Sequence, residues 1–162
     1  MASTPLPPPK AVKDLFTDLV GKEVGVGTGK PVLVTPVSDT YIGVFTTDRM
    51  QTGAIIVMDL ALAGYLGGAL GLLPAKSIQD AVDRRMLPQL AVDNIGEVYN
   101  IAASIFNVPG ARHVRMYQVI GPEEPAPLDV LALANALGRR MDLDVEVPGY
   151  GTGRLSVVLS PN

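Results

Sequence analysis

The chain has 162 residues, the size of one globular domain, and its composition of 48% hydrophobic and 18% charged residues indicates a substantial core. Its net charge of −3 excludes the basic surface typical of nucleic-acid binding. The absence of cysteine excludes disulfides, thiolate metal sites and a cysteine nucleophile, and the single histidine gives no basis for a His-rich metal site. We therefore expect no metal bound by this chain.

The first residues predict a tail followed by a helix. Residues 1–9 are Pro-rich and lack the basic region and apolar core of a signal peptide, so we expect a disordered tail, a domain spanning 10–162 and a cytoplasmic location. Between residues 10 and 20, apolar side chains recur at steps of three and four and predict an amphipathic helix. Gly21 is a typical residue to end it.

A group of strands follows. We expect strands at 22–28, 31–37, 40–46 and 52–58, with Ser38 and Asp39 joining the second and third as a hairpin. The run from Gly25 to Lys30 is similar to a phosphate-binding loop, but Val24 stands where that motif needs glycine, and Pro31 follows the lysine where Ser or Thr is needed. A strand end and a turn are the better interpretation.

Residues 54–73 are apolar enough to be considered as a membrane span, since Asp59 is the only charge among them. However, residues 54–58 are typical of a strand, and the glycine-rich stretch from Leu60 is typical of a buried helix. Asp59 lies at the junction, where an N-cap residue is expected. We favour a strand, a cap and a buried helix, and expect no membrane segment.

The second half predicts further helices and strands. We expect helices at 76–87 and 128–140, and strands at 112–120, 142–147 and 154–160. His113 lies in the first of these strands, where a polar residue on an exposed face needs no catalytic role.

Residues 89–107 predict the helix around which the function is organised. Its apolar residues recur at steps of three or four, which places them on one side: Leu87, Ala91, Ile95, Val98, Ala102 and Ile105. A second stripe with the same spacing is polar: Asp93, Glu97, Asn100, Ser104 and Asn107. Pro88 stands where the first turn tolerates proline, and residues 108–110 end the helix.

The polar stripe is rich in residues that weaken helices. Asp, Asn and Ser compete with the helix backbone for hydrogen bonds, whereas an ordinary exposed face carries Lys, Glu, Arg and Gln. Glu97 and Asn100 lie one turn apart and project side by side. From the pattern alone, a face of short side chains packed under a loop remains an open alternative to a functional face.

The spacing Asp93-x3-Glu97-x2-Asn100 resembles the active-site helix of the CheC/CheX/FliY phosphatases, which act on CheY-type response regulators. The family pattern continues with a proline about twenty-two residues further on, for which Pro122 and Pro125 are candidates at imperfect spacing. With one motif helix, the chain is more similar to CheX than to CheC, which has two. The likeness covers about two-thirds of the chain, and the helix near Leu128 is an addition.

The resemblance implies an α/β (α+β) fold of the CheC type: one domain with a mostly antiparallel sheet covered by helices. It implies hydrolysis of the phospho-aspartate of a CheY-like response regulator in two-component or chemotaxis-type signalling. Asn100 would orient the attacking water and Glu97 would pair with a lysine of the regulator. Asp93 and Ser104 are expected to contribute to binding, Asp93 through a supporting contact. Mg²⁺ is expected on the regulator, and the chain is expected to form a homodimer through its sheet.

Two alternatives stay open. One is a catalytically silent module that keeps the fold and docks a regulator, because Tyr99 lies between the motif residues and Ala103-Ser104 stands where family helices often have glycine. The other is a structural protein held together by oligomerisation, in which Glu97 and Asn100 form a buried polar contact.

Overall fold

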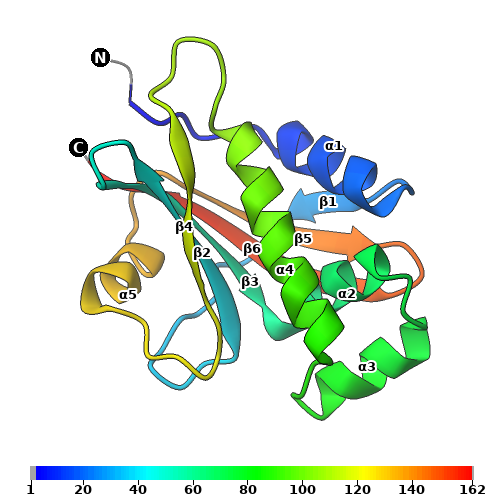
Figure 1. The fold of residues 1–162 in the computed structure, drawn as a ribbon. Helices are drawn as coiled ribbons and strands as arrows, with labels where there is room; N and C mark the ends of the chain where they lie inside the picture. Colours follow the sequence, from blue (N-terminus) through cyan, green and yellow to red (C-terminus); the bar gives the residue numbers. More distant parts are fainter. Residues whose placement is uncertain (1–2, 162) are drawn as a thin grey trace.

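The structure is a computed structural model that describes residues 3–161. Its elements in chain order are α1 (Pro9–Val20), β1 (Gly25–Thr28), β2 (Thr40–Thr47), β3 (Thr52–Asp59), α2 (Leu60–Leu70), α3 (Ala75–Asp83), α4 (Gln89–Ala102), the short 3₁₀ helix η1 (Ala103–Ile105), β4 (Val114–Ile120), α5 (Leu128–Ala134), β5 (Arg140–Val147) and β6 (Gly151–Leu159). The strands form one six-stranded antiparallel sheet in the order β1-β5-β6-β3-β2-β4 (Figure 1). The predicted fold class is confirmed.

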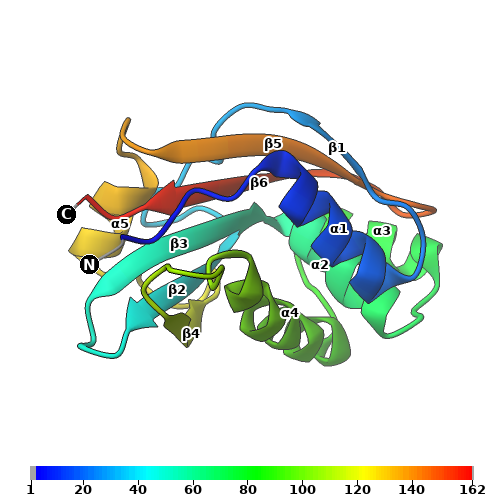
Figure 2. The same ribbon diagram turned by 90° about the horizontal axis from the view of Figure 1, so that it is seen from above.

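The central strands β2 and β3 are buried on both faces, and alternate residues serve two separate cores. Ala54, Ile56 and Met58 of β3 point into the larger core, beneath α1, α2 and α4 (Figure 1). Ile55 and Val57 point into a smaller core on the opposite face, which α5 covers through Val130 and Ala134. In Figure 2, α5 lies well apart from α1 and α4. Helices therefore cover both faces, and α4 has the larger core behind it.

The hairpin predicted for residues 31–37 and 40–46 is wrong. Residues 31–37 form no strand, although Val32 and Val34 are buried in the smaller core and the intervening Leu33 is exposed. The main-chain N–H of Val32 bonds to the Ser156 hydroxyl, at 2.9 Å, instead of to a neighbouring strand. Prolines at both ends of the segment lack the N–H that a ladder requires. The alternation that predicted a strand therefore reflects side-chain packing without strand pairing.

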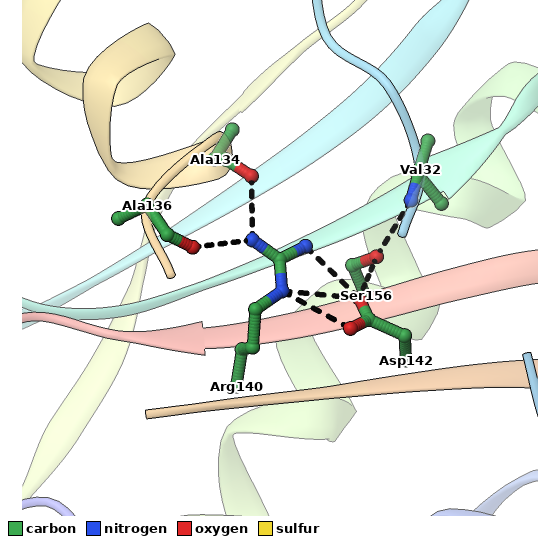
Figure 3. A network of polar contacts seen from close by, with 6 residues as sticks. All are labelled: Val32, Ala134, Ala136, Arg140, Asp142 and Ser156. Carbon is green, nitrogen blue, oxygen red and sulfur yellow. Dashed lines mark hydrogen bonds and ion pairs between the residues drawn. The ribbon is translucent and has the colours of Figure 1, made fainter. Parts of the chain in front are cut away.

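A partly buried polar network connects this segment and α5 to the sheet (Figure 3). The Arg140 guanidinium donates to the carboxylate of Asp142, at 2.9–3.3 Å, and to the carbonyls of Ala134 and Ala136 just after the last turn of α5, at 3.0 and 2.7 Å. The Ser156 hydroxyl donates to Asp142 at 2.6 Å. Burial raises the pKa of Asp142, but the hydrogen bonds from Arg140 and Ser156 and the Arg140 charge outweigh that effect, so the pKa lies below its ordinary value.

Three helices are shorter than predicted. α3 ends at Asp83 because Arg85 has a left-handed backbone, with φ at 57°, and α5 ends at Ala134, before the chain enters β5. The predicted helix at 89–107 is α4 followed by η1. Among the strands, β1 begins at Gly25, three residues later than predicted, and β6 begins at Gly151, three residues earlier than predicted. Gly21 ends α1 as predicted, with φ at 81°.

The apolar stretch at 54–73 divides as predicted into β3 and α2. Asp59 is the N-cap of α2, and its carboxylate accepts from the Leu62 N–H at 2.9 Å. Within residues 3–161, none of the helices has the length and apolar character needed to cross a membrane.

The segment expected to be a tail lies against the domain where the structure describes it. Thr4 and Pro7 are buried, and α1 begins at Pro9, one residue before the expected domain boundary.

Candidate functional site on helix α4

Helix α4 is held in one rotational setting by its buried side. Ile95 and Val98 are buried as predicted, together with Ala91 and Ala102, and Ile105 is buried in η1. Tyr99 is also fully buried. Its ring packs edge-on against Phe45, with centroids 6.4 Å apart, and its hydroxyl donates to the Tyr41 carbonyl at 2.6 Å. Burial raises the pKa of Tyr99 well above its usual value, so the hydroxyl remains a donor at neutral pH.

Gly67 in α2 allows α4 to approach closely. A Cβ atom on Gly67 would lie 2.4 Å from the carbonyl oxygen of Ala91 in α4, so only glycine fits the present spacing. At the same point, the Asn94 side-chain amide donates to the Gly67 carbonyl at 2.9 Å. The contact between the Gly67 and Ala91 backbones and the hydrogen bond from Asn94 together fix how closely α4 packs on α2 and which side of α4 faces it.

The polar stripe consequently faces solvent. Asp93, Glu97, Asn100 and Ser104 are all exposed on α4 and η1, on the side away from the sheet. Asp93 accepts a hydrogen bond from the Gln89 amide at 2.8 Å, within the same helix. Among the described residues, neither Glu97 nor Asn100 has a hydrogen-bond partner, so a carboxylate and a carboxamide one turn apart are free to contact another molecule.

This exposure bears on the alternatives. Glu97 and Asn100 are exposed in the single chain, so the interpretation of this stripe as a face packed under a loop is wrong. Tyr99, although it stands between them in sequence, points into the core and leaves their face clear. Ser104 lies beyond the last turn of α4 and lines an apolar groove of about 530 Å³ with Leu15 and Val108.

Asn107, the last member of the predicted polar stripe, has a structural position. Its side chain is half-buried and makes both hydrogen bonds of a strand partner with Val114, donating to the carbonyl at 2.8 Å and accepting from the N–H at 2.9 Å. It therefore joins the end of η1 to the start of β4 and does not share the exposed face. His113, predicted to lie in the strand at 112–120, is exposed immediately before β4, which begins at Val114.

Of the two candidate prolines, Pro122 is the one near the motif helix. It lines a cavity of about 450 Å³ together with Gln89 and Val92, which belong to the first turn of α4. Pro125 is exposed in the loop that leads to α5. No sequence pattern indicated this cavity, because its walls come from segments far apart in the chain.

No cluster of three or more His, Cys, Asp or Glu side chains suited to holding a metal occurs in the described part of the chain, residues 3–161. The exposed stripe contains a single pair of carboxylates, those of Asp93 and Glu97, separated by one helical turn. The groups at this face that remain available are therefore hydrogen-bonding and ion-pairing groups for a docking molecule.

Comparison with solved structures identifies the architecture. A chain of the CheX–CheY–BeF₃–Mg²⁺ complex from Borrelia burgdorferi matches with a TM-score of 0.57 and 17% identity over 94% of each chain. Thermotoga maritima FliY matches with a TM-score of 0.58 and 11% identity, over 91% of this chain and 81% of FliY. This chain has the CheC/CheX/FliY fold.

A third solved structure also matches this chain. The FliM–SpeE complex from H. pylori contains a match with a TM-score of 0.57 and 10% identity, over 93% of this chain and 80% of that chain. No family model matches the sequence, and no curated protein matches it. At 10–17% identity the likeness establishes the fold alone. Any activity of this chain therefore has to follow from its own residues.

Proposed function

We propose that this protein is a phosphatase that hydrolyses the phospho-aspartate of a CheY-like response regulator, with the exposed face of α4 as its active surface. The observation that carries the proposal is the position of Glu97 and Asn100. They lie side by side, exposed and without hydrogen-bond partners, on a helix whose opposite side is fixed by Tyr99 and Asn94. Rigid support of an unpaired polar pair is what a site completed by a second protein requires.

The chemistry proposed for this face is water positioning. Hydrolysis of an acyl phosphate depends on placing the attacking water in line and on stabilising charge, and it needs little help from a strong base. The Asn100 carboxamide can accept from a water and donate to a phosphoryl oxygen. Glu97, one turn away, would pair with a lysine of the regulator and fix the docking register. Asp93 and Ser104 would extend the contact along the same stripe.

Magnesium belongs to the regulator in this proposal. Acyl phosphates on carboxylates are commonly stabilised by Mg²⁺ held by carboxylates of the phosphorylated protein, and the α4 face presents no oxygen cluster of its own. The residues of this chain would act around that ion without binding it.

Exposed apolar residues support a protein as the substrate. Leu90 and Ile101 border the motif on α4 and are 49% and 36% exposed. Polar groups flanked by accessible aliphatic side chains are typical of protein–protein contact surfaces, where the apolar residues provide buried area and the polar ones orient the partner.

The proposal is tested by following the decay of regulators phosphorylated with acetyl phosphate, using those encoded in the same genome as candidates. Wild-type protein should accelerate the decay of at least one of them. A panel in which every regulator decays at its intrinsic rate, in the presence of Mg²⁺ and excess protein, would contradict it.

A second candidate function is a docking module without turnover. The similarity of the fold to a chain of the FliM–SpeE complex favours it, because that structure describes this architecture in a complex with another protein. Binding of a phosphorylated regulator without accelerated decay would support this candidate over the phosphatase.

We also propose that the protein forms a homodimer through its sheet. Strand β4 pairs with β2 on one side and stands at the end of the sheet. Asn107 occupies the outward N–H and C=O of Val114 at the start of β4, and the rest of the outer edge can add a strand. Such a dimer leaves α4 accessible. Light scattering at tens of micromolar should give the mass of two chains, and a monomer at that concentration would contradict the proposal.

A further inference from the structure

A cavity at the first turn of α4 has the chemistry of a site for a basic side chain. The end of β4 and the start of α4 lie at the same end of the molecule (Figure 1), and the loop after β4, the start of β2 and the segment between α3 and α4 enclose about 450 Å³ there. Three carboxylates line it, from Asp39, Glu123 and Glu124, against one guanidinium, from Arg85. Arg85 is already paired with Asp39, at 3.2 Å.

The wall of the cavity contains a largely buried tyrosine whose hydroxyl oxygen is accessible and has no partner among the described residues. Tyr41 is only 8% exposed, it lines the cavity, and its hydroxyl makes no hydrogen bond within residues 3–161. Burial raises the pKa of Tyr41, and the charges of Glu123 and Asp39, which line the same cavity, raise it further. A buried tyrosine usually satisfies its hydroxyl inside the protein, so an open one marks a position that an incoming polar group can complete.

Part of the cavity lining is apolar. Leu60, Leu87 and Val92 line the cavity together with the acidic groups, as does Met86, which is 76% exposed. Lysine and arginine bury an aliphatic stem and keep a charged head among polar groups, so a lining that combines apolar side chains, carboxylates and a phenolic oxygen matches their two-part character.

The cavity adjoins the motif directly. Gln89 lines it and donates to Asp93, the first motif residue, at 2.8 Å. Asp93 and then Glu97 come after Gln89 along α4. Their carboxylates continue the negative charge of the cavity onto the motif face. A protein that docks on Glu97 and Asn100 is within reach of this end of the helix, about two turns away.

We propose that this cavity is an anchoring site for a lysine or arginine side chain of the protein that docks on α4. This inference rests on the proposed function, because it takes the same docking partner. It assigns to Tyr41, Glu123 and Glu124 a role in binding and in selecting partners with a basic residue beside the phosphorylation site, with no part in the hydrolysis itself.

The test uses regulators phosphorylated with acetyl phosphate, with beryllofluoride-treated regulators for binding. Replacing both Glu123→Gln and Glu124→Gln should raise KM and Kd by about five- to twentyfold at low salt and leave kcat unchanged, because these charges act in docking. The difference from wild type should shrink as salt is raised, since exposed charges are screened. The control, Asp48→Asn with Glu146→Gln, removes two exposed charges elsewhere and should leave KM unchanged.

Tyr41→Phe separates binding from stability. Because the Tyr41 hydroxyl has no partner in the free protein, its removal should leave the free energy of unfolding unchanged and still weaken regulator binding several-fold. Unchanged KM and Kd in both the double variant and Tyr41→Phe would overturn the inference while leaving the phosphatase proposal intact. A separate measurement tests the phosphatase proposal: full activity of Asn100→Ala would contradict the assignment of α4 as the active surface. If no regulator binds the wild type, both proposals are overturned.

Discussion

Replacing Gly67 with alanine should separate α2 from α4 and thereby test how the motif helix is positioned. The added Cβ would lie 2.4 Å from the Ala91 carbonyl oxygen and 3.0 Å from its carbon, about 1 Å closer than ordinary van der Waals contact. A backbone carbonyl cannot rotate away, so α4 has to move. The move would also weaken the hydrogen bond from Asn94 to the Gly67 carbonyl.

The magnitude follows from two opposing effects. Overpacking costs about 1–3 kcal/mol, and a weakened hydrogen bond adds about 1 kcal/mol, while alanine in a helix returns about 1 kcal/mol relative to glycine. We expect Gly67→Ala to lower the free energy of unfolding by about 1–3 kcal/mol. Gly96→Ala, on α4, is the matched control. Its Cβ would meet nothing within 4 Å, so it should raise stability by about 0.5–1 kcal/mol.

Urea denaturation followed by circular dichroism at 222 nm measures both changes, and the slope m should stay constant if only the native packing is altered. The two variants make the same chemical change in two helices, so helix propensity alone predicts a gain for both. If Gly67→Ala is as stable as Gly96→Ala, the close approach of α2 and α4 does not fix the position of the motif helix.

Two further predictions concern the supports of the fold. Asn107→Ala removes both side-chain hydrogen bonds to Val114 and should cost about 1–3 kcal/mol in urea denaturation, with unaltered affinity for a regulator; a loss of affinity at full stability would contradict a structural role. The pKa of Asp142 is lowered in the folded state, so its contribution is present above its unfolded pKa and is lost as the pH falls through the folded value. Urea midpoints from pH 7 to pH 3 should therefore fall more steeply for wild type than for Asp142→Asn, and parallel curves would contradict this assignment.

The helix carrying the motif was predictable because its information is local. Apolar residues at steps of three and four determine which side of α4 is buried. Glu97 and Asn100 lie on the other side, and they are exposed whichever elements pack against the apolar side. The apolar pattern did not predict that Tyr99 is buried, because its position depends on the space beside Gly43. A Cβ added to Gly43 would lie 2.7 Å from the Tyr99 ring. The face of the helix was therefore predictable and its depth was not.

Errors arose where packing between distant segments decides the structure. Val32 and Val34 alternate with exposed Leu33 as in a strand, but Ser156 on β6 takes the N–H that a neighbouring strand would have bonded. Asn107 has the same spacing as the motif residues, and only the position of β4 shows that it supports the backbone.

The acidic cavity was likewise not predictable from the sequence. It joins Tyr41 on β2 to Glu123 after β4, and no local pattern connects these two positions. Charge and spacing in the sequence can indicate a helix face. A pocket between distant segments can be recognised only once their positions in the folded structure are known.

The assignment of α4 as the active surface is tested most directly by the rate at which Asn100→Ala dephosphorylates a regulator that wild-type protein demonstrably dephosphorylates. Asn100 is exposed and unpaired, and alanine is the better helix former, so the variant should fold and bind the regulator as wild type does. Loss of a positioned hydrogen-bonding group should lower kcat by about a hundredfold or more. Glu97→Ala, measured alongside, should lower both kcat and affinity. An Asn100→Ala variant with wild-type kcat would show that α4 is not the active surface.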